Sequence, residues 1–515
     1  MMGVMHRTTT PPSSDVPSRS LRQLALGVLM PGFNGATAPD WLLEAAAEGL
    51  GSVMLVAQNA PDVTSTRALT DAVHAAGPVL TTVDEEGGDV SRLQAASGSA
   101  LPGAGALGAA DDPDLTERAG AALGALVRAA GIDLDLAPVL DVASEPTNPV
   151  IGVRSFGPGR ELVSRHGVAF LAGLHAGGVG GCAKHFPGHG ATTTDSHLEL
   201  PRLDVTAQVL ADRDLPPFEA AGAAGVDALM TGHLHIPALG PQPASLEPAV
   251  TALARRLPGG TDRVIVTDAL DMRAVSEGAG DGFGAACVRA LQAGADLLCL
   301  GTTAGRDEVA MFETAVEAII GALARGELAA DALERSISRV RGLYERIAGY
   351  RAAAPELSPA EAEAAVAEVG RQAARAAVRV ERGEVRLAGA GAPVLVDLRR
   401  RYNQATGRVA PGFANALAAR FPDARVILAG AAEAEPLADV LGALPPEVAV
   451  LALTREPLAD QREQEDLDLL LARRPDAVVI HGGTAAGAPE ADRLVLAHGV
   501  GRANAEAALR LVLGD

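Results

Sequence analysis

Short apolar runs and longer helical segments alternate along the chain from about residue 20. The apolar runs are rich in β-branched residues and lie at 25–30, 52–57, 79–84, 132–141, 181–186, 228–233, 264–268 and 296–300. Between them lie Ala- and Leu-rich stretches with helical spacing, such as 114–130, 161–176 and 283–293. Repeated strand–helix units predict a parallel sheet that is buried on both faces. About eight units over roughly 320 residues predict a (β/α)8 barrel of the TIM type.

A second α/β unit follows the predicted barrel. A helical tract runs from residue 307 to about residue 380 and is interrupted near Pro355. Strand-like runs then return at 393–398, 424–430, 448–454 and 476–482, with helical segments between them. This pattern predicts a smaller doubly wound α/β domain. We expect a disordered tail at 1–18, a barrel domain at 19–345, a helical linker at 346–385 and a C-terminal α/β domain at 386–515.

Composition narrows the class of protein. The 515 residues carry a formal net charge of −21, which argues against a nucleic-acid partner, because phosphates attract a basic face. No apolar stretch has the roughly 18 residues of a membrane span, and the polar start predicts a tail and not a signal peptide. The three cysteines lie in apolar runs, which is typical of buried thiols in a reducing compartment. We therefore expect a cytoplasmic protein that does not bind membranes.

Polar residues close several of the predicted barrel strands. They are Asp84, Asp141, the pair Lys184–His185, His233 and Asp268. In a barrel of parallel strands these C-terminal ends meet around one mouth, where active sites are built. Lys184 is the only lysine, since the other 42 of the 43 Lys and Arg residues are arginines.

The densest polar motif begins at Lys184. It reads K-H-F-P-G-H-G over residues 184–190 and continues to Asp195, Ser196 and His197. Asp195 and His197 are two residues apart in a loop, so the carboxylate can hydrogen-bond the imidazole and keep it basic enough to exchange a proton. The alternatives are a structural loop and a zinc site. Lys184 opposes a bound cation and no Cys or Glu completes the usual ligand spacing, so we expect catalysis without a metal.

Three further constellations add charged groups to the same mouth. Asp268 ends the run V-I-V-T-D, where a carboxylate is costly unless it is paired or used, so it is a candidate nucleophile or general base. Asp84 lies in V-D-E-E-G-G with Arg92 following, and Arg154 lies in N-P-V-I-G-V-R-S-F-G. Each alone has an ordinary interpretation as a salt bridge, turn or helix cap. Together they predict a mixed-charge pocket that suits a neutral, hydroxyl-rich ligand.

These four motifs, in this order and spacing, resemble family-3 glycoside hydrolases of the β-N-acetylhexosaminidase branch. The resemblance covers residues from about 20 to 345. It implies a retaining exo-glycosidase that needs no cofactor and removes a terminal β-linked N-acetylglucosamine from short glycosides or cell-wall fragments.

The resemblance also implies roles for individual residues. Asp268 matches the nucleophile that forms a glycosyl-enzyme, and His197, supported by Asp195, matches the general acid/base. The positions that match sugar-binding residues are Asp84, Arg92, Arg154, Lys184 and His185. His233 is a further candidate for the pocket wall.

Three alternatives stay open at this point. A His acid/base repels an anionic acceptor less than a carboxylate does, so phosphate is a candidate acceptor and the enzyme a candidate phosphorylase. A β-glucosidase of the same family and a catalytically silent sugar-binding barrel are the others. One departure from the family pattern is Asp89, where relatives often carry Arg; it predicts a more acidic pocket edge. Phe, Tyr and Trp make up only 3% of the chain, which predicts a short substrate.

Overall fold

The computed structural model describes residues 19–194, 199–272, 275, 282–302, 305–387, 391–400, 411–430 and 435–514. Its N-terminal part is a curled parallel sheet whose strands are all buried. The strands are β1 (Leu29–Pro31), β2 (Ser52–Leu55), β3 (Leu80–Val83), β4 (Leu134–Asp135), β5 (Gly180–Phe186), β6 (Ala228–Thr231), β7 (Val264–Thr267) and β8 (Leu298–Gly301). Strands β2 to β7 pair in chain order, β1 pairs with β8, and a parallel bridge between Val266 and Leu297 connects β7 to β8. The predicted barrel is confirmed.

Two of the predicted strands differ from the observed ones. Residues 25–30 were expected to be a strand, but helix α1 covers Leu21–Leu26 and β1 begins only at Leu29. Ser20 and Gln23 form a reciprocal capping box that starts this helix. The strand expected at 132–141 is limited to β4, because Pro138 has no N–H to continue the ladder. The rest of this segment still runs alongside β5, because the Leu140 N–H donates to the Lys184 carbonyl at 2.6 Å.

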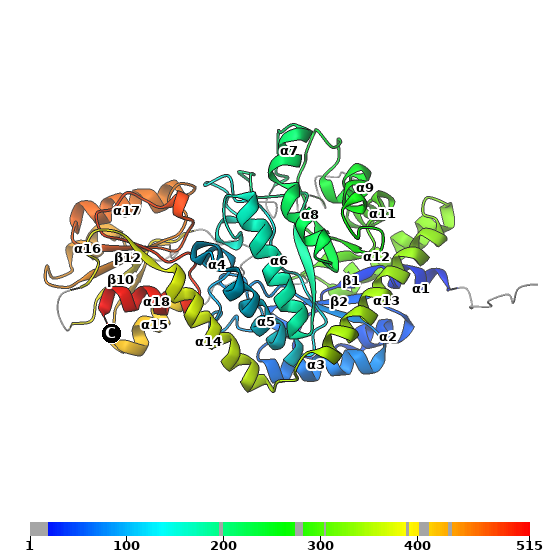
Figure 1. Cartoon of the computed structure of the whole chain (residues 1–515), viewed down its shortest axis with the longest axis horizontal. Coiled ribbons are helices and arrows are strands. Elements are labelled where there is room, and N and C mark those ends of the chain that lie inside the picture. Colours follow the sequence, from blue (N-terminus) through cyan, green and yellow to red (C-terminus); the bar gives the residue numbers. More distant parts are fainter. Residues whose placement is uncertain are drawn as a thin grey trace, which may run out of the picture.

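Helices surround the sheet on its outer side (Figure 1). They are α2 (Asp40–Glu48), α3 (Val63–Ala76), α4 (Ala104–Ala110), α5 (Pro113–Ala129), α6 (Arg160–Gly177), α7 (Ala207–Arg213), α8 (Leu215–Ala223), α9 (Pro248–Arg256), α11 (Phe283–Ala293), α12 (Glu308–Arg325) and α13 (Ala330–Ala353). Helices α5 and α6 pack closely against each other. Gly173 permits this approach because it has no side chain, and a Cβ there would lie only 2.2 Å from the Glu117 carbonyl oxygen. Within the described residues, no helix has the length and apolarity to cross a membrane.

The C-terminal part has its own six-stranded sheet, in the order β11-β10-β12-β13-β14-β9. Its strands are β9 (Arg379–Arg382), β10 (Val394–Asp397), β11 (Val426–Leu428), β12 (Val450–Thr454), β13 (Val478–His481) and β14 (Leu494–Leu496). Five are parallel, and β9 joins the edge antiparallel to β14. Helices α15 (Gly412–Arg420), α16 (Leu437–Gly442), α17 (Gln461–Arg473) and α18 (Arg502–Leu513) cover it. The predicted doubly wound α/β fold is confirmed; β9, whose residues are all exposed, and the short β14 were not predicted.

Helix α14 (Pro359–Ala377) lies between the two parts and contacts both (Figure 1). It packs against α4 and α5 of the barrel and against α18 of the second domain. A Cβ on Gly370 would lie 1.8 Å from the Ala100 carbonyl oxygen, so glycine lets α14 touch the backbone of the segment that follows β3. The second domain is therefore packed against the mouth loops of the barrel.

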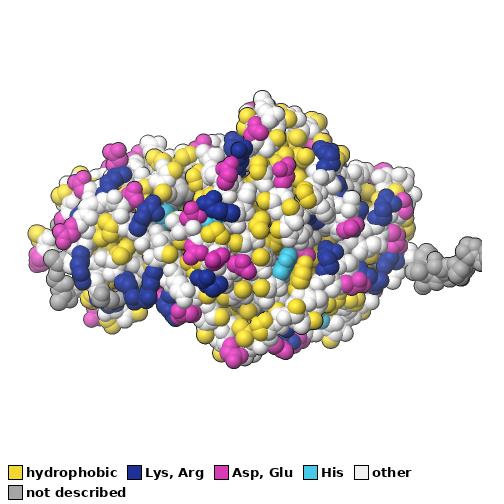
Figure 2. All heavy atoms as spheres, in the orientation of Figure 1, with side chains coloured by type: hydrophobic (Ala, Val, Ile, Leu, Met, Phe, Trp, Pro, Cys, Tyr) yellow, Lys and Arg dark blue, Asp and Glu magenta, His cyan; other side chains and the backbone are white. Residues whose placement is uncertain are grey.

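The surface is not uniformly acidic despite the net charge of −21. Figure 2 shows acidic and basic side chains mixed over the visible face, with arginines gathered where α14, α15 and α18 meet. Arg371, Arg375, Arg420 and Arg510 line a shallow groove there. The three cysteines are buried and free, as their apolar surroundings predicted.

Candidate active site at the barrel mouth

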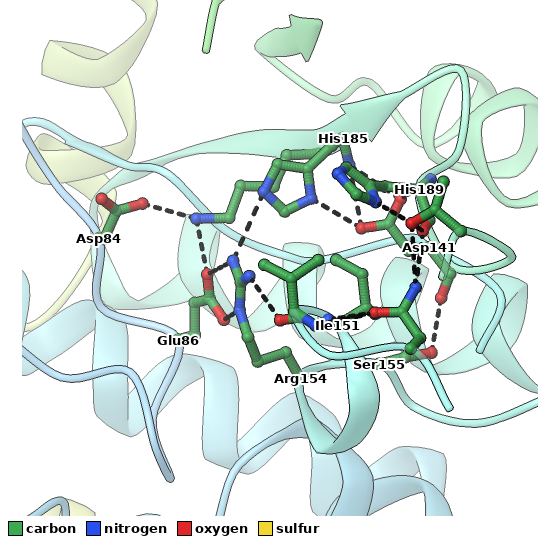
Figure 3. A network of polar contacts seen from close by, with 12 residues as sticks. Asp84, Glu86, Asp141, Ile151, Arg154, Ser155, His185 and His189 are labelled. Carbon is green, nitrogen blue, oxygen red and sulfur yellow. Dashed lines mark hydrogen bonds and ion pairs between the residues drawn. The ribbon is translucent and has the colours of Figure 1, made fainter. Parts of the chain in front are cut away.

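Lys184 lies in the C-terminal part of β5, and its ammonium group binds two carboxylates, Asp84 and Glu86, which are labelled in Figure 3. Its Nζ is 2.6 Å from Asp84 Oδ1 and 2.7 Å from Glu86 Oε1, and the residue is 2% exposed. Burial opposes the charged form of lysine, but the two carboxylates outweigh it and hold the pKa of Lys184 above its usual value. Lys184 therefore stays a cation inside the mouth.

Arg154 completes this charge network from the loop that follows β4. It lies in a short 3-10 turn (Gly152–Arg154) and grips Glu86 with two hydrogen bonds, Nε to Oε2 at 2.9 Å and Nη2 to Oε1 at 2.7 Å. A third bond from Nη1 to the Val150 carbonyl, at 3.1 Å, fixes the guanidinium plane. Burial favours neutral Glu86, but Arg154 and Lys184 outweigh it and hold the pKa of Glu86 well below its usual value.

Glu86 was missed as a site residue, although a signal was present in the sequence. In an extended segment, alternate residues face the same side, so the acid two positions after Asp84 was a candidate for the same mouth. Glu85, between them, is instead buried away from Lys184 and accepts the Arg92 and Leu93 N–H groups on Oε2 at 2.8 and 2.9 Å. Burial raises the pKa of Glu85, which favours its neutral form.

A second pair of residues orients His185. Its Nδ1 lies 2.7 Å from Asp141 Oδ2, and its Nε2 lies 3.4 Å from Arg154 Nη2. Asp141 Oδ1 also accepts the His189 backbone N–H at 2.6 Å. Burial would raise the pKa of Asp141, but His185 and His189 outweigh it and lower the pKa below its usual value. Asp141, noted in the sequence only as the end of a strand, thus fixes both the His185 ring and the start of the following loop.

His189 is almost fully buried in this cluster, at 1% exposure. Its Nδ1 lies 2.8 Å from Thr192 Oγ1, and among the described residues its Nε2 has no hydrogen-bond partner. Burial lowers the pKa of His189 to about 4, although the charges of Asp141 and Asp268 act in the opposite direction. The ring is therefore neutral near pH 7.

Asp268 follows β7 and is half-buried. Its Oδ1 accepts the Ala269 N–H at 2.8 Å. His233, expected to line the pocket, contacts this backbone: Nε2 lies 2.9 Å from the Ala269 carbonyl and Nδ1 lies 2.7 Å from Ser245 Oγ. Because both ring nitrogens bind protein atoms, His233 acts as a support for the segment that carries Asp268.

The predicted sites thus fall into three groups. The structure brings together Asp84, Arg154, Lys184 and His185 in one polar network, with Asp268 acting on the adjoining His189. Arg92 has a half-buried side chain beside Glu85. The predicted acid/base pair, Asp195 and His197, lies outside the described residues. The described network offers fixed anionic acceptors and cationic donors, an arrangement that binds hydroxyl groups by charge-assisted hydrogen bonds.

Comparison with known proteins gives a family match over the N-terminal part of the chain. Residues 30–343 match the family described as the glycosyl hydrolase family 3 N terminal domain. The beta-hexosaminidase of Xylella fastidiosa (strain 9a5c) is 36% identical over 314 residues, which cover 57% of this chain and 89% of the relative. Beta-hexosaminidase A of Pseudoalteromonas piscicida is 31% identical over 324 residues; these cover 58% of this chain and only 54% of that longer relative.

A solved structure covers both domains. It is a glycoside hydrolase family 3 beta-N-acetylglucosaminidase from Paenibacillus sp. str. FPU-7, with a TM-score of 0.83 and 30% identity. The match covers 96% of each chain. The second domain therefore has a counterpart in that protein, as the barrel does.

The low pKa of His189 predicts a pH-dependent stability. The unfolded imidazole titrates near 6.5, so between about pH 6.5 and 4 the unfolded chain binds more protons than the folded one. The contribution of neutral His189 to the free energy of unfolding is thus fully present above about pH 6.5. It falls by up to about 3 kcal/mol as the pH drops through this window to about 4. Urea unfolding at several pH values should show that the free energy of unfolding falls less on acidification in His189→Gln than in the unsubstituted protein. Equal losses in the two proteins would contradict this assignment.

Proposed function

The chain belongs to glycosyl hydrolase family 3, and we propose that it is an exo-acting β-N-acetylglucosaminidase. Its substrates would be short glycosides or cell-wall fragments that end in a β-linked N-acetylglucosamine. The 96% coverage of the Paenibacillus enzyme and the named beta-hexosaminidases support this specificity. The observation that carries the proposal is the buried network of Asp84, Glu86, Arg154 and Lys184 at the strand ends.

This network suits the glycone of such a substrate. A sugar hydroxyl both donates and accepts, so it can donate to a carboxylate such as Asp84 and accept from Lys184. The groups are held by one another before the ligand arrives, which limits the entropy lost on binding. A ligand without the matching hydroxyls would displace water from these charged groups without replacing its hydrogen bonds, so we expect it to bind more weakly.

Asp268 is the proposed nucleophile of a retaining mechanism. Its carboxylate oxygen attacks the anomeric carbon while the glycosidic oxygen leaves with a proton, and the resulting glycosyl-enzyme is then opened by water. The Ala269 N–H on Oδ1 stabilises the carboxylate, and His233 holds the Ala269 carbonyl. Both contacts fix the direction from which the nucleophile attacks.

His197 is the proposed general acid and base, with Asp195 as its partner. The loop that leads to these residues is anchored up to residue 192: Asp141 accepts the His189 N–H, and Asn148 Nδ2 donates to the His189 carbonyl at 3.0 Å. In the first step His197 gives its proton to the leaving oxygen, and in the second it takes one from the incoming nucleophile. A neutral imidazole tolerates an anionic acceptor, so phosphorolysis, in which phosphate replaces water and a sugar 1-phosphate is released, is the rival reaction to test.

The nucleophile can be identified by trapping. We expect a fluorinated N-acetylglucosamine derivative with a good leaving group to form a covalent adduct on the Asp268 peptide, detected by mass spectrometry. Asp268→Ala should lose at least about 1000-fold in kcat for an aryl β-N-acetylglucosaminide. Asp271→Asn is the matched control, because Asp271 is three positions away and pairs with Arg306 at 2.9 Å; it should still label at Asp268.

The same assay separates the rival functions. Faster cleavage of an aryl β-glucoside would indicate a β-glucosidase, and sugar binding without turnover would indicate a silent barrel. Sugar 1-phosphate formed in the presence of phosphate would indicate a phosphorylase. An adduct on a residue other than Asp268 would overturn the proposed mechanism.

Replacing the single lysine tests the glycone site. Lys184→Arg keeps the charge, but a planar guanidinium is larger than an ammonium and does not fit between Asp84 and Glu86. We expect kcat/KM for the N-acetylglucosaminide to fall about 10- to 100-fold, with much of the loss in KM. Steady-state kinetics with circular dichroism as a folding control would measure this. A variant as active as the unsubstituted enzyme would show that the shape of the cation is unimportant.

A further inference from the structure

Asp89 connects the mouth of the barrel to the second domain. Its Oδ1 accepts the Val500 backbone N–H at 2.8 Å, and its Oδ2 lies 3.3 Å from Arg455 Nη2. The Asp89 side chain is 1% exposed and that of Arg455 is 10% exposed. Val500 precedes α18 and Arg455 follows β12. One buried carboxylate of the barrel thus binds two elements of the second domain.

The charge of Asp89 is complementary to the surface that it meets. Arg455 and Arg399 lie after the C-terminal ends of β12 and β10, and the negative charge of Asp89 is one of the influences that favour the charged form of Arg399. An arginine at position 89 would face two guanidinium groups, so a carboxylate is the residue that fits this interface. The acidic pocket edge expected from Asp89 is therefore directed at the second domain.

Close backbone contacts surround this ion pair. A Cβ on Gly501 would lie 3.1 Å from the Gly88 carbonyl oxygen, and one on Gly370 would lie 1.8 Å from that of Ala100. Ala503 N–H reaches the Ser99 carbonyl at 3.4 Å. The second domain and α14 therefore hold both ends of the segment 87–101.

That segment continues directly from the groups proposed to bind the sugar. Glu86 precedes Gly87 and Gly88, which both have positive φ angles of 76° and 58°. The two glycines allow a tight turn beside Glu86, and the Glu86 N–H donates across it to the Val90 carbonyl at 3.0 Å, so the position of Glu86 is tied to the residues just beyond the turn. Asp89 is the first residue beyond it.

We propose that Asp89 is a positioning residue for the sugar site, and that the second domain acts on catalysis through it. By binding Val500 and Arg455, Asp89 fixes the turn at Gly87 and Gly88 and so holds Glu86 against Lys184 and Arg154. The kinetic part of this inference rests on the proposed function. The structural part, that Asp89 orders the segment 87–101, is independent of which substrate the enzyme cleaves.

Graded substitutions separate the two bonds of Asp89. Asp89→Asn keeps an acceptor for the Val500 N–H and loses the charge, whereas Asp89→Leu loses both. We expect KM for the aryl N-acetylglucosaminide to rise about 3-fold in the first and about 10-fold or more in the second, with a smaller change in kcat. Arg455→Gln should resemble Asp89→Asn, and the double variant should be no worse than either. Asp476→Asn is the control, since Asp476 pairs with Arg474 within the second domain at 3.0 Å.

Hydrogen–deuterium exchange gives a readout that does not need activity. In Asp89→Leu we expect faster exchange in peptides that cover 86–101 and 499–505, with unchanged protection in β6, β7 and β13. Unchanged exchange and KM in Asp89→Leu would overturn the inference, as would a uniform loss of protection in both domains, which would show a general role in stability. If the unsubstituted protein cleaves no N-acetylglucosaminide, the proposed function fails, and the exchange experiment still decides the structural part.

Discussion

Lys184 holds a positive charge between Asp84 and Glu86 at a place that water barely reaches. Arg154 shares Glu86, so two cations and two carboxylates neutralise one another at the barrel mouth. Removing one member of such a set leaves an uncompensated buried charge, which typically costs about 3–5 kcal/mol. Each residue of the set therefore depends on the other three. The mouth has one arrangement that satisfies all four, and the proposed sugar site is built from it.

This dependence brings together segments that are far apart in the sequence. Asp84 and Glu86 follow β3, Arg154 lies in the loop after β4, and Lys184 belongs to β5. Asp141 and His185 form a second pair, which connects the segment after β4 to β5. Because parallel strands end at the same side of the barrel, these residues meet without long side chains having to cross the core. Asp89 is one more paired carboxylate, and it binds the second domain to the segment that follows β3.

Much of this arrangement could be predicted from the sequence. The β-branched runs located six of the eight barrel strands closely, and the polar residues that end them marked Asp84, Lys184, His185 and Asp268 as site residues. The resemblance of four motifs to a known family supplied the roles of these residues. The start of the first strand was misassigned because the apolar run continues from α1 into β1; Leu and Ala are good helix formers, and the capping box at Ser20 and Gln23 starts the helix.

What could not be predicted depends on tertiary partners. Glu86 was passed over although it lies two positions after Asp84 on an extended segment; only its pairing with Arg154 and Lys184 needed the structure. His233 was expected to line the pocket, and only the positions of Ser245 and Ala269 show that it supports the backbone. The direction of Asp89 depends on Arg455 and Val500, which lie hundreds of residues away in the sequence. Local pattern carries no information about such pairs.

We propose that the charge network around Lys184 is the glycone site and that it faces Asp268. A crystal structure of the enzyme with bound N-acetylglucosamine would show the sugar's position. We expect ring hydroxyls within hydrogen-bond distance of Asp84, Lys184 and His185, and the anomeric carbon directed at the Asp268 carboxylate. A sugar bound elsewhere, or one whose anomeric carbon points away from Asp268, would contradict it.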